Sequence, residues 1–142
     1  MRMDLQLGEA LPPAHHAARK RRIERVLLVE DSMLIALDAE DSLLQSGAGE
    51  VVIAGNVRAA LAAIDEALPD FAVLDYNLGD ESSEPVARAL AAAGVPFCFA
   101  TGYGDALERM SERPPCGVLT KPYSTQDIAE ALARAEAGCD EG

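Results

Sequence analysis

The feature that most constrains the fold is a regular alternation between short apolar runs and segments of helical periodicity. Two of the apolar runs, Val26-Leu27-Leu28-Val29 and Phe71-Ala72-Val73-Leu74, are apolar at every position rather than at every second one. Strands of this kind are buried on both faces, which is typical of parallel sheets covered on both sides by crossover helices. The sequence therefore predicts an α/β fold.

Five strand–helix units follow one another between residues 23 and 137. We expect strands at 25–29, 50–54, 71–75, 95–100 and 117–119, and helices at 33–46, 57–68, 84–93, 105–113 and 125–137. This pattern fits the flavodoxin-like arrangement, a parallel five-stranded sheet of strand order 2-1-3-4-5 flanked by five helices. Residues 1–22 are expected to form a loose N-terminal extension, and 138–142 a short tail.

The helix expected at 57–68 has the clearest local signals. Its apolar stripe consists of residues spaced by three or four: Val57, Leu61, Ile64 and Leu68. Asn56 is the expected cap of this helix, and Pro69 is expected to end it. In the last helix, Ser124 and Asp127 match a capping box.

Charge and hydropathy exclude several classes of function. The net charge is −12, yet residues 1–25 carry six basic and three acidic side chains, so the remainder carries −15. A body this acidic repels nucleic-acid phosphates, and aromatic residues for stacking bases make up only 4% of the chain. No apolar run approaches the roughly 18 residues of a membrane helix, and the N-terminal residues do not lead us to expect a secretory signal. We therefore expect a cytoplasmic protein that binds neither nucleic acid nor membrane.

The three cysteines, Cys98, Cys116 and Cys139, are widely spaced and form no C-x-x-C pair. This spacing favours reduced thiols over a disulfide framework or a zinc site. We expect them to be buried or incidental.

Acidic residues follow two of the expected strands. Glu30 and Asp31 come after the first strand, and Asp75 ends the third. Because ligands of open parallel sheets bind beyond the carboxyl ends of the strands, the three carboxylates are expected at one edge. Carboxylates placed close together repel one another, and Mg²⁺, which prefers oxygen ligands, removes that repulsion. The three residues are therefore a candidate Mg²⁺ site.

Groups that bind oxyanions follow two further strands. Thr101 comes after the fourth strand, and Lys121-Pro122 after the fifth. A hydroxyl, an ammonium and a metal ion together neutralise the equatorial oxygens of a phosphoryl group under attack by a carboxylate. The expected product is an aspartyl phosphate on Asp75.

These residues together resemble the response-regulator receiver family of two-component signalling over residues 23–137. The family has an acidic pair after strand one, Asp after strand three, Thr or Ser after strand four and Lys-Pro after strand five. The matching residues are Glu30-Asp31, Asp75, Thr101 and Lys121-Pro122. The Lys-Pro peptide is cis in relatives, which the resemblance implies for this chain as well.

The resemblance also implies a role for each residue. Asp75 would be the phosphoacceptor, and Lys121 would pair first with Asp75 and then with the phosphate. Asp31, Asp75 and the backbone carbonyl of Asn77 would bind Mg²⁺. Glu30 would orient a metal-bound water.

The segment 96–104, PFCFATGYG, resembles a subgroup of largely stand-alone receivers with a Phe-Ala-Thr-Gly-x-Tyr-like signature. Most receivers carry an aromatic switch residue three positions before the lysine, where this chain has Val118. Tyr103, which lies between two glycines, is the candidate replacement, and a tyrosine simply packed over the next helix is the alternative. The polar segment 105–113 is the expected moving part.

The expected function is that of a single-domain response regulator. It would take a phosphoryl group from a histidine kinase or a histidine phosphotransfer protein, signal to a downstream protein, and catalyse only its own phosphorylation and dephosphorylation. One alternative is a pseudo-receiver that serves as a binding scaffold without phosphate. The other is a small phosphatase with Asp75 as nucleophile, although such enzymes need a second acid at the position of Asn77. Asp80 and Glu81 are interpreted as loop decoration rather than as groups that recruit a cation.

Overall fold

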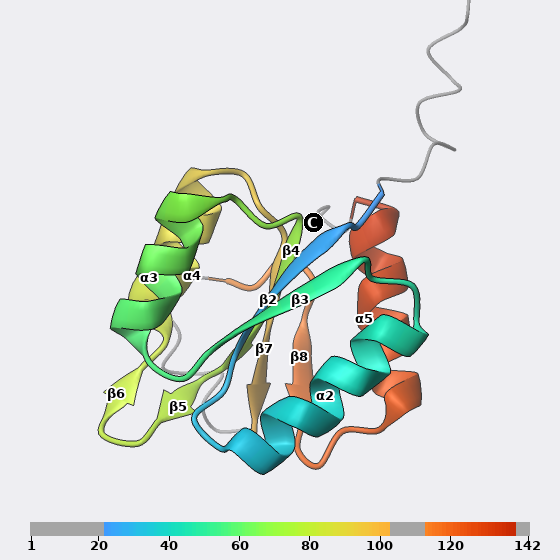
Figure 1. The fold of residues 1–142 in the computed structure, drawn as a ribbon, viewed down its shortest axis with the longest axis horizontal. Helices are drawn as coiled ribbons and strands as arrows, with labels where there is room; N and C mark the ends of the chain where they lie inside the picture. Colours follow the sequence, from blue (N-terminus) through green and yellow to red (C-terminus); the bar gives the residue numbers. More distant parts are fainter. Residues whose placement is uncertain (1–21, 103–112, 139–142) are drawn as a thin grey trace, which may run out of the picture.

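The computed structural model describes residues 22–102 and 113–138, and Figure 1 shows their fold. Five strands form the main sheet: β2 (Arg25–Val29), β3 (Glu50–Ala54), β4 (Phe71–Asp75), β7 (Phe97–Thr101) and β8 (Val118–Thr120). Four helices lie in the described residues: α2 (Met33–Gln45), α3 (Val57–Glu66), α4 (Glu84–Ala92) and α5 (Thr125–Glu136). A short hairpin of β5 (Asn77–Leu78) and β6 (Glu81–Ser82) follows β4. None of the helices in this described part is long and apolar enough to span a bilayer.

The main sheet has the order β3-β2-β4-β7-β8, and every neighbouring pair is parallel. In chain order this is 2-1-3-4-5, so the predicted fold class and strand order are confirmed. The fifth predicted helix, at 105–113, lies outside the described residues except for Arg113, which is not helical.

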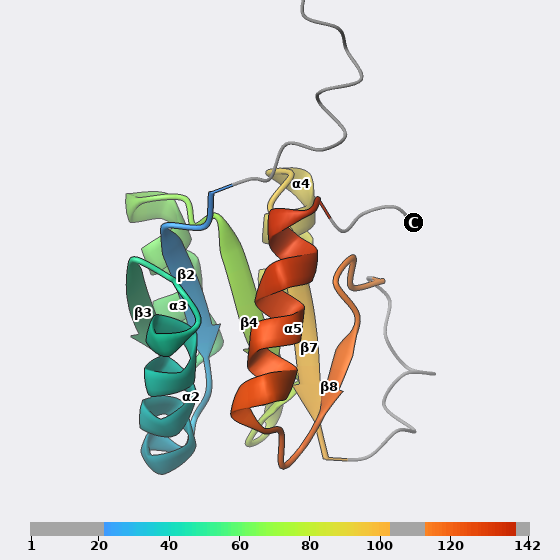
Figure 2. The ribbon, with the colours of Figure 1, turned by 90° about the vertical axis from the view of Figure 1, so that its right-hand side faces the viewer.

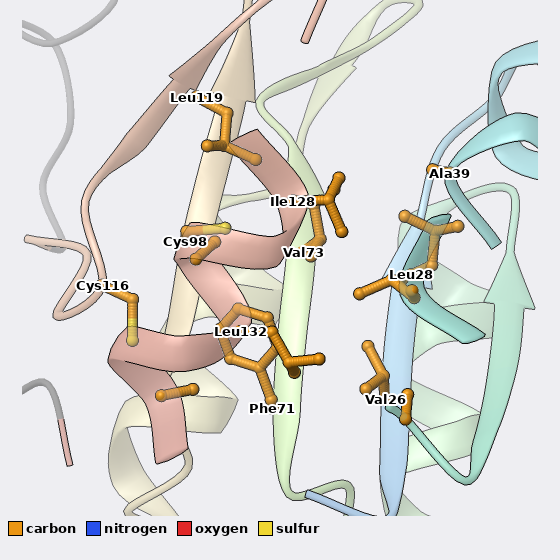
Figure 3. Close-up of a cluster of buried hydrophobic side chains, with 14 of the residues drawn as sticks. Val26, Leu28, Ala39, Phe71, Val73, Cys98, Cys116, Leu119, Ile128 and Leu132 are labelled. Atoms are coloured by element: carbon orange, nitrogen blue, oxygen red, sulfur yellow. The ribbon is translucent and has the colours of Figure 1, made fainter. Parts of the chain in front are cut away.

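Helices cover both faces of the sheet, with α2 and α5 on one side and α3 and α4 on the other (Figures 1 and 2). Alternate side chains of one strand therefore enter different cores. Val26 and Leu28 of β2 pack with α2 and α5, whereas Leu27 and Val29 pack on the opposite face. Figure 3 shows the first core, in which Leu132 of α5 lies over the sheet. Because each fully buried Val or Leu contributes about 1.5–3 kcal/mol, continuous apolar strands favour this three-layer arrangement.

The predicted caps at the starts of α3 and α5 are confirmed, whereas α3 ends at Glu66 instead of continuing to Pro69 as predicted. The Asn56 side chain accepts a hydrogen bond from the backbone N–H of Ala59 at 2.8 Å, and Ser124 and Asp127 form a reciprocal capping box. The predicted apolar stripe of α3 is wrong at Leu68, which is 51% exposed. The helix ends at Glu66 because the next residue is already extended, which turns the side chain of Leu68 away from the core.

The cysteines differ from one another. Cys98 on β7 is a free buried thiol, and burial raises its pKa to about 12, so it stays protonated. Cys116 is buried in the same core (Figure 3) but is disulfide-bonded, so the prediction of reduced thiols is wrong for this residue. Spacing along the chain does not reveal which sulfur atoms meet in the fold. Cys139 lies outside the described residues.

Candidate functional site

Three carboxylates meet at the carboxyl edge of the sheet. Glu30 and Asp31 follow β2, and Asp75 ends β4, the neighbouring strand. One oxygen of each side chain lies within 4.8 Å of the other two. Glu30 and Asp75 are only 3% and 5% exposed, whereas Asp31 is exposed. The backbone N–H of Ser32 donates to Glu30 Oε2 at 3.0 Å and fixes that carboxylate. The structure thus brings together the three acids expected at one edge.

Lys121 contacts two of these carboxylates. Its Nζ atom is 3.1 Å from Asp75 Oδ2 and 3.3 Å from Glu30 Oε1. The backbone N–H of Lys121 donates to the carbonyl of Thr101 at 2.9 Å, which continues the pairing of β8 with β7. The Lys121–Pro122 peptide is cis, as predicted.

The cluster perturbs the protonation of its own members. The pKa of the Asp75 carboxyl is raised from 3.8 to about 6, mainly by burial; the Lys121 ammonium opposes this rise and the Glu30 carboxylate adds to it. Burial disfavours the charged form of Lys121, but Asp75 and Glu30 outweigh this effect and raise the pKa of the ammonium. One ammonium thus pairs with two of the three clustered carboxylates, so the carboxylates outnumber the cation beside them.

The donor set fits a hard divalent cation. Three carboxylates supply the oxygen ligands that Mg²⁺ prefers, and the exposed Asp31 keeps one side of the cluster in contact with solvent. Mg²⁺ commonly retains several waters, so an open side suits it. An ammonium beside the same carboxylates adds a group that binds oxyanions.

Thr101 and Asn77 follow the strands that carry the cluster. Asp75 pairs in register with Ala100 of β7, so Thr101 lies one residue further towards the carboxyl edge, and it is buried. Asn77 begins β5, two residues after Asp75. The predicted hydroxyl and the predicted backbone carbonyl thus lie at the edge that carries the acids.

Only one of the two candidate switch residues lies in the described part. Val118 is half-buried, pairs with Phe99 of β7 and packs against the core beneath α3 and α4. Tyr103 lies outside the described residues. Tyr123, which our sequence reasoning missed, packs against the core beneath α2 and α5, and its buried hydroxyl has no hydrogen-bond partner among the residues that the structure describes. The only sequence signal for Tyr123 is its position two residues after Lys121.

A hairpin that the sequence analysis also missed borders the cluster. Strands β5 and β6 are antiparallel, and Gly79 and Asp80 form the turn between them. Gly79 has a φ of 76°, a conformation that favours glycine. A Cβ atom added there would lie 3.9 Å from Asp31 Oδ2, so the turn lies against the acidic cluster. A glycine–aspartate pair between two short segments was the available signal.

One acidic residue of this hairpin reaches a neighbouring helix. Glu81 Oε2 accepts a hydrogen bond from the backbone N–H of Val57, the first residue of α3, at 3.1 Å. The interpretation of Glu81 as loop decoration is therefore wrong. Sequence alone did not show this contact because 24 residues separate the two partners.

The residue after Asp75 is tied to α4. The hydroxyl of Tyr76 donates to Glu84 Oε2 at 2.8 Å, and both side chains are buried. The Tyr76 ring packs edge-on against Phe99 of β7, with a centroid distance of 5.2 Å. These contacts connect the carboxyl end of β4 to the first turn of α4.

An apolar pocket of about 690 Å³ reaches the site. Its lining residues are Leu34, Ile35, Asp38, Gly102, Lys121, Pro122 and Tyr123. At the start of α2, Leu34 is 82% exposed, and Met33 and Leu37 are exposed as well. Exposed apolar side chains grouped in this way mark surfaces that bind proteins or other apolar ligands.

Similarity to known proteins is found among solved structures. No protein-family model and no curated protein matches the sequence. The solution structure of SdrG from Sphingomonas melonis Fr1 is 41% identical, with 80% of this chain and 97% of that protein covered and a TM-score of 0.62. The response regulator PhyR from Brucella abortus is 25% identical over 87% of this chain, with a TM-score of 0.71; this chain spans 51% of the length of PhyR. A CheY-like response regulator receiver domain protein from Methanospirillum hungatei JF-1 is 22% identical, with 82% and 96% covered and a TM-score of 0.68, and shows similarity of fold.

Proposed function

Because the chain belongs to the response-regulator receiver family, we propose that it is a response regulator that accepts a phosphoryl group on Asp75. The donor is a histidine kinase or a histidine phosphotransfer protein, and the signal passes to a downstream protein. The observation that carries this proposal is the environment of Asp75. The buried carboxylate of Asp75 lies 3.1 Å from the Lys121 ammonium, and one of its oxygens lies within 4.8 Å of oxygens from Glu30 and Asp31.

An oxygen of Asp75 is the nucleophile. It forms a bond to phosphorus while the bond between phosphorus and the donor nitrogen breaks, and the electron pair of that bond leaves with the donor imidazole. Only the ionised carboxylate attacks. A pKa of about 6 leaves most Asp75 side chains ionised at neutral pH.

Lys121 and Thr101 stabilise the phosphoryl oxygens. When Asp75 becomes an acyl phosphate, its carboxyl group loses its negative charge. The Lys121 ammonium, 3.1 Å from Asp75 Oδ2, can then bind a phosphoryl oxygen instead. The hydroxyl of Thr101 is the neutral donor at the same edge.

Asp31, Asp75 and the backbone carbonyl of Asn77 would hold Mg²⁺, and Glu30 would complete the metal site through a water. When bound, the ion neutralises charge on the phosphoryl oxygens during transfer. The Glu30 carboxylate is held on both sides, by the backbone N–H of Ser32 and by Lys121, which suits an orienting role toward a metal-bound water.

The surface beside the site suits a protein donor. Asp75 is buried, so a donor must place its phosphohistidine at the bottom of the site, and neighbouring surface must contact the donor. The exposed Leu34 and Leu37 of α2 and the apolar pocket supply such a surface.

We place the protein in the cytoplasm with these donors. The output switch proposed here remains Tyr103, because Val118 has no aromatic ring to turn inward.

Incubation of the full chain with Mg²⁺ and a small phosphodonor, followed by intact-mass measurement, tests the proposal. We expect a base-labile gain of one phosphoryl group that requires Mg²⁺ and is lost in Asp75→Asn. Asp65→Asn, which changes an exposed acid on α3, is the matched control and retains the gain. Absence of the gain in the wild-type chain favours the pseudo-receiver. Continuous hydrolysis of small phosphate esters, without a protein-bound phosphate, favours the phosphatase.

A further inference from the structure

We propose that Glu81 is a positioning residue for the cation site: its hydrogen bond to α3 holds the β5–β6 hairpin against the carboxylate cluster and thereby fixes the backbone carbonyl of Asn77. The inference rests on the proposed function only in that it takes this cluster to be a Mg²⁺ site. It assigns a role to an exposed acid that is not itself one of the clustered carboxylates.

The hairpin needs external anchors. Each of its strands has two residues, and an isolated two-stranded hairpin is at best marginally stable in water. Its base is closed by the backbone N–H of Ser83, which donates to the carbonyl of Tyr76 at 3.0 Å. The contact of Glu81 with Val57 is the anchor near the turn.

The start of α3 is a suitable partner for this carboxylate. The first N–H groups of a helix have no partner within the helix, and the positive end of the helix dipole favours an anion there. The Asn56 side chain already accepts from Ala59, and Glu81 accepts from Val57. Two different backbone donors are thus satisfied, one by the local cap and one by the hairpin.

The anchored hairpin borders the carboxylate cluster at Gly79 and carries Asn77, whose carbonyl is the proposed further ligand. Asn77 pairs with Ser82, the residue after Glu81, so the position of the Asn77 carbonyl depends on the path of β6. Gly79 lies against Asp31 Oδ2, with only 3.9 Å between that oxygen and a Cβ placed on the glycine. A hairpin released from α3 would shift both the backbone carbonyl and the wall beside Asp31.

Negative charge alone would be a different explanation of any effect on cation binding. Asp80 separates the two explanations, because it precedes Glu81 in the same hairpin, is exposed and carries the same charge. Both acids attract a cation by their charge, and this attraction weakens as the salt concentration rises. The hydrogen bond from Val57, in contrast, is made to Glu81 and not to Asp80.

The test is a calorimetric titration of the full unphosphorylated chain with MgCl₂ at neutral pH, at low and at high salt. Glu81→Ala is expected to raise the dissociation constant for Mg²⁺ about fivefold at both salt concentrations. Loss of the hydrogen bond between Glu81 and Val57 would leave the Asn77 carbonyl less firmly held. Glu81→Gln retains an oxygen that accepts from Val57 and is expected to stay within about twofold of the wild type. The Val57 amide resonance should move in Glu81→Ala and much less in Glu81→Gln.

Asp80→Ala is the matched control and should change the constant by less than about twofold, with any change lost at high salt. Equal weakening in Asp80→Ala, Glu81→Ala and Glu81→Gln that disappears in salt would overturn the proposal in favour of charge attraction. An unchanged constant in Glu81→Ala, or a wild-type chain that binds no Mg²⁺, would overturn it as well. Because the titration uses no phosphodonor, a chain that binds Mg²⁺ but is not phosphorylated would refute the proposed function and leave this inference standing.

Discussion

Asp75 is expected to destabilise the metal-free protein at neutral pH, so its replacement by Asn should stabilise the fold. The pKa of this carboxyl rises from 3.8 to about 6 on folding, and burial is the main cause. Below about pH 3 the carboxyl is mostly protonated in both the folded and the unfolded state, so it adds little pH dependence. Between the two pKa values the unfolded chain releases its proton while the folded chain keeps it, so folding stability falls as the pH rises.

The size of the effect follows from the two pKa values. A pKa difference of this size corresponds to about 3 kcal/mol at pH 7 and about 1 kcal/mol near pH 4.5. The free energy of unfolding gained by Asp75→Asn should therefore be about 2 kcal/mol greater at pH 7 than near pH 4.5. Comparison of the two pH values removes contributions of the substitution that do not depend on pH.

Urea denaturation in the presence of a chelator, followed by circular dichroism, measures both variants at both pH values. Asp65→Asn, on the exposed side of α3, is the control and should change stability by less than about 0.5 kcal/mol at either pH. Mg²⁺ added at pH 7 should stabilise the wild type more than Asp75→Asn. A gain that is equal at both pH values, or a loss that grows toward pH 7, would refute the reasoning.

Three further predictions concern the donor surface, the ammonium and a helix cap. Leu34→Glu should slow phosphorylation by a protein donor at least about tenfold, because that donor needs the exposed start of α2. Phosphorylation by a small phosphodonor should be unchanged, and equal slowing with both donors would contradict the prediction. Lys121→Ala should slow phosphorylation by a small phosphodonor about a hundredfold while the chain stays folded, and a change of less than about threefold would argue against its role in transfer. Ser124→Ala should lower the free energy of unfolding by about 1 kcal/mol, because it removes one half of the capping box of α5. Urea denaturation measures this change, and an unchanged free energy of unfolding would contradict the prediction.

Much of the fold could be predicted because its signals are local. Val26, Leu27 and Phe71 belong to runs that are apolar at every position, and such runs become stable only when both faces of the strand are covered. Neighbouring parallel strands then bring their carboxyl ends to one edge. For this reason Glu30 and Asp75, 45 positions apart in the sequence, were expected to be neighbours.

What was missed depends on contacts between distant segments. The β5–β6 hairpin has too few residues for a periodic signal, and its contact between Glu81 and Val57 exists only after α3 and the sheet have packed. Leu68 continues the apolar spacing of α3, but the helix has already ended before it. The disulfide at Cys116 was likewise not foreseen, because the spacing of cysteines does not report how close their side chains come.

The central claim is that Asp75 itself receives the phosphoryl group, and chemical trapping tests it most directly. Borohydride reduces an acyl phosphate on aspartate to homoserine, so peptide mass spectrometry can locate the modified residue. After treatment with Mg²⁺ and a phosphodonor, homoserine is predicted at position 75 and at no other acid, and omission of Mg²⁺ should abolish it. Homoserine at Asp31, the one-carbon-longer alcohol 2-amino-5-hydroxypentanoic acid at Glu30, or no reduced residue at all would contradict the account.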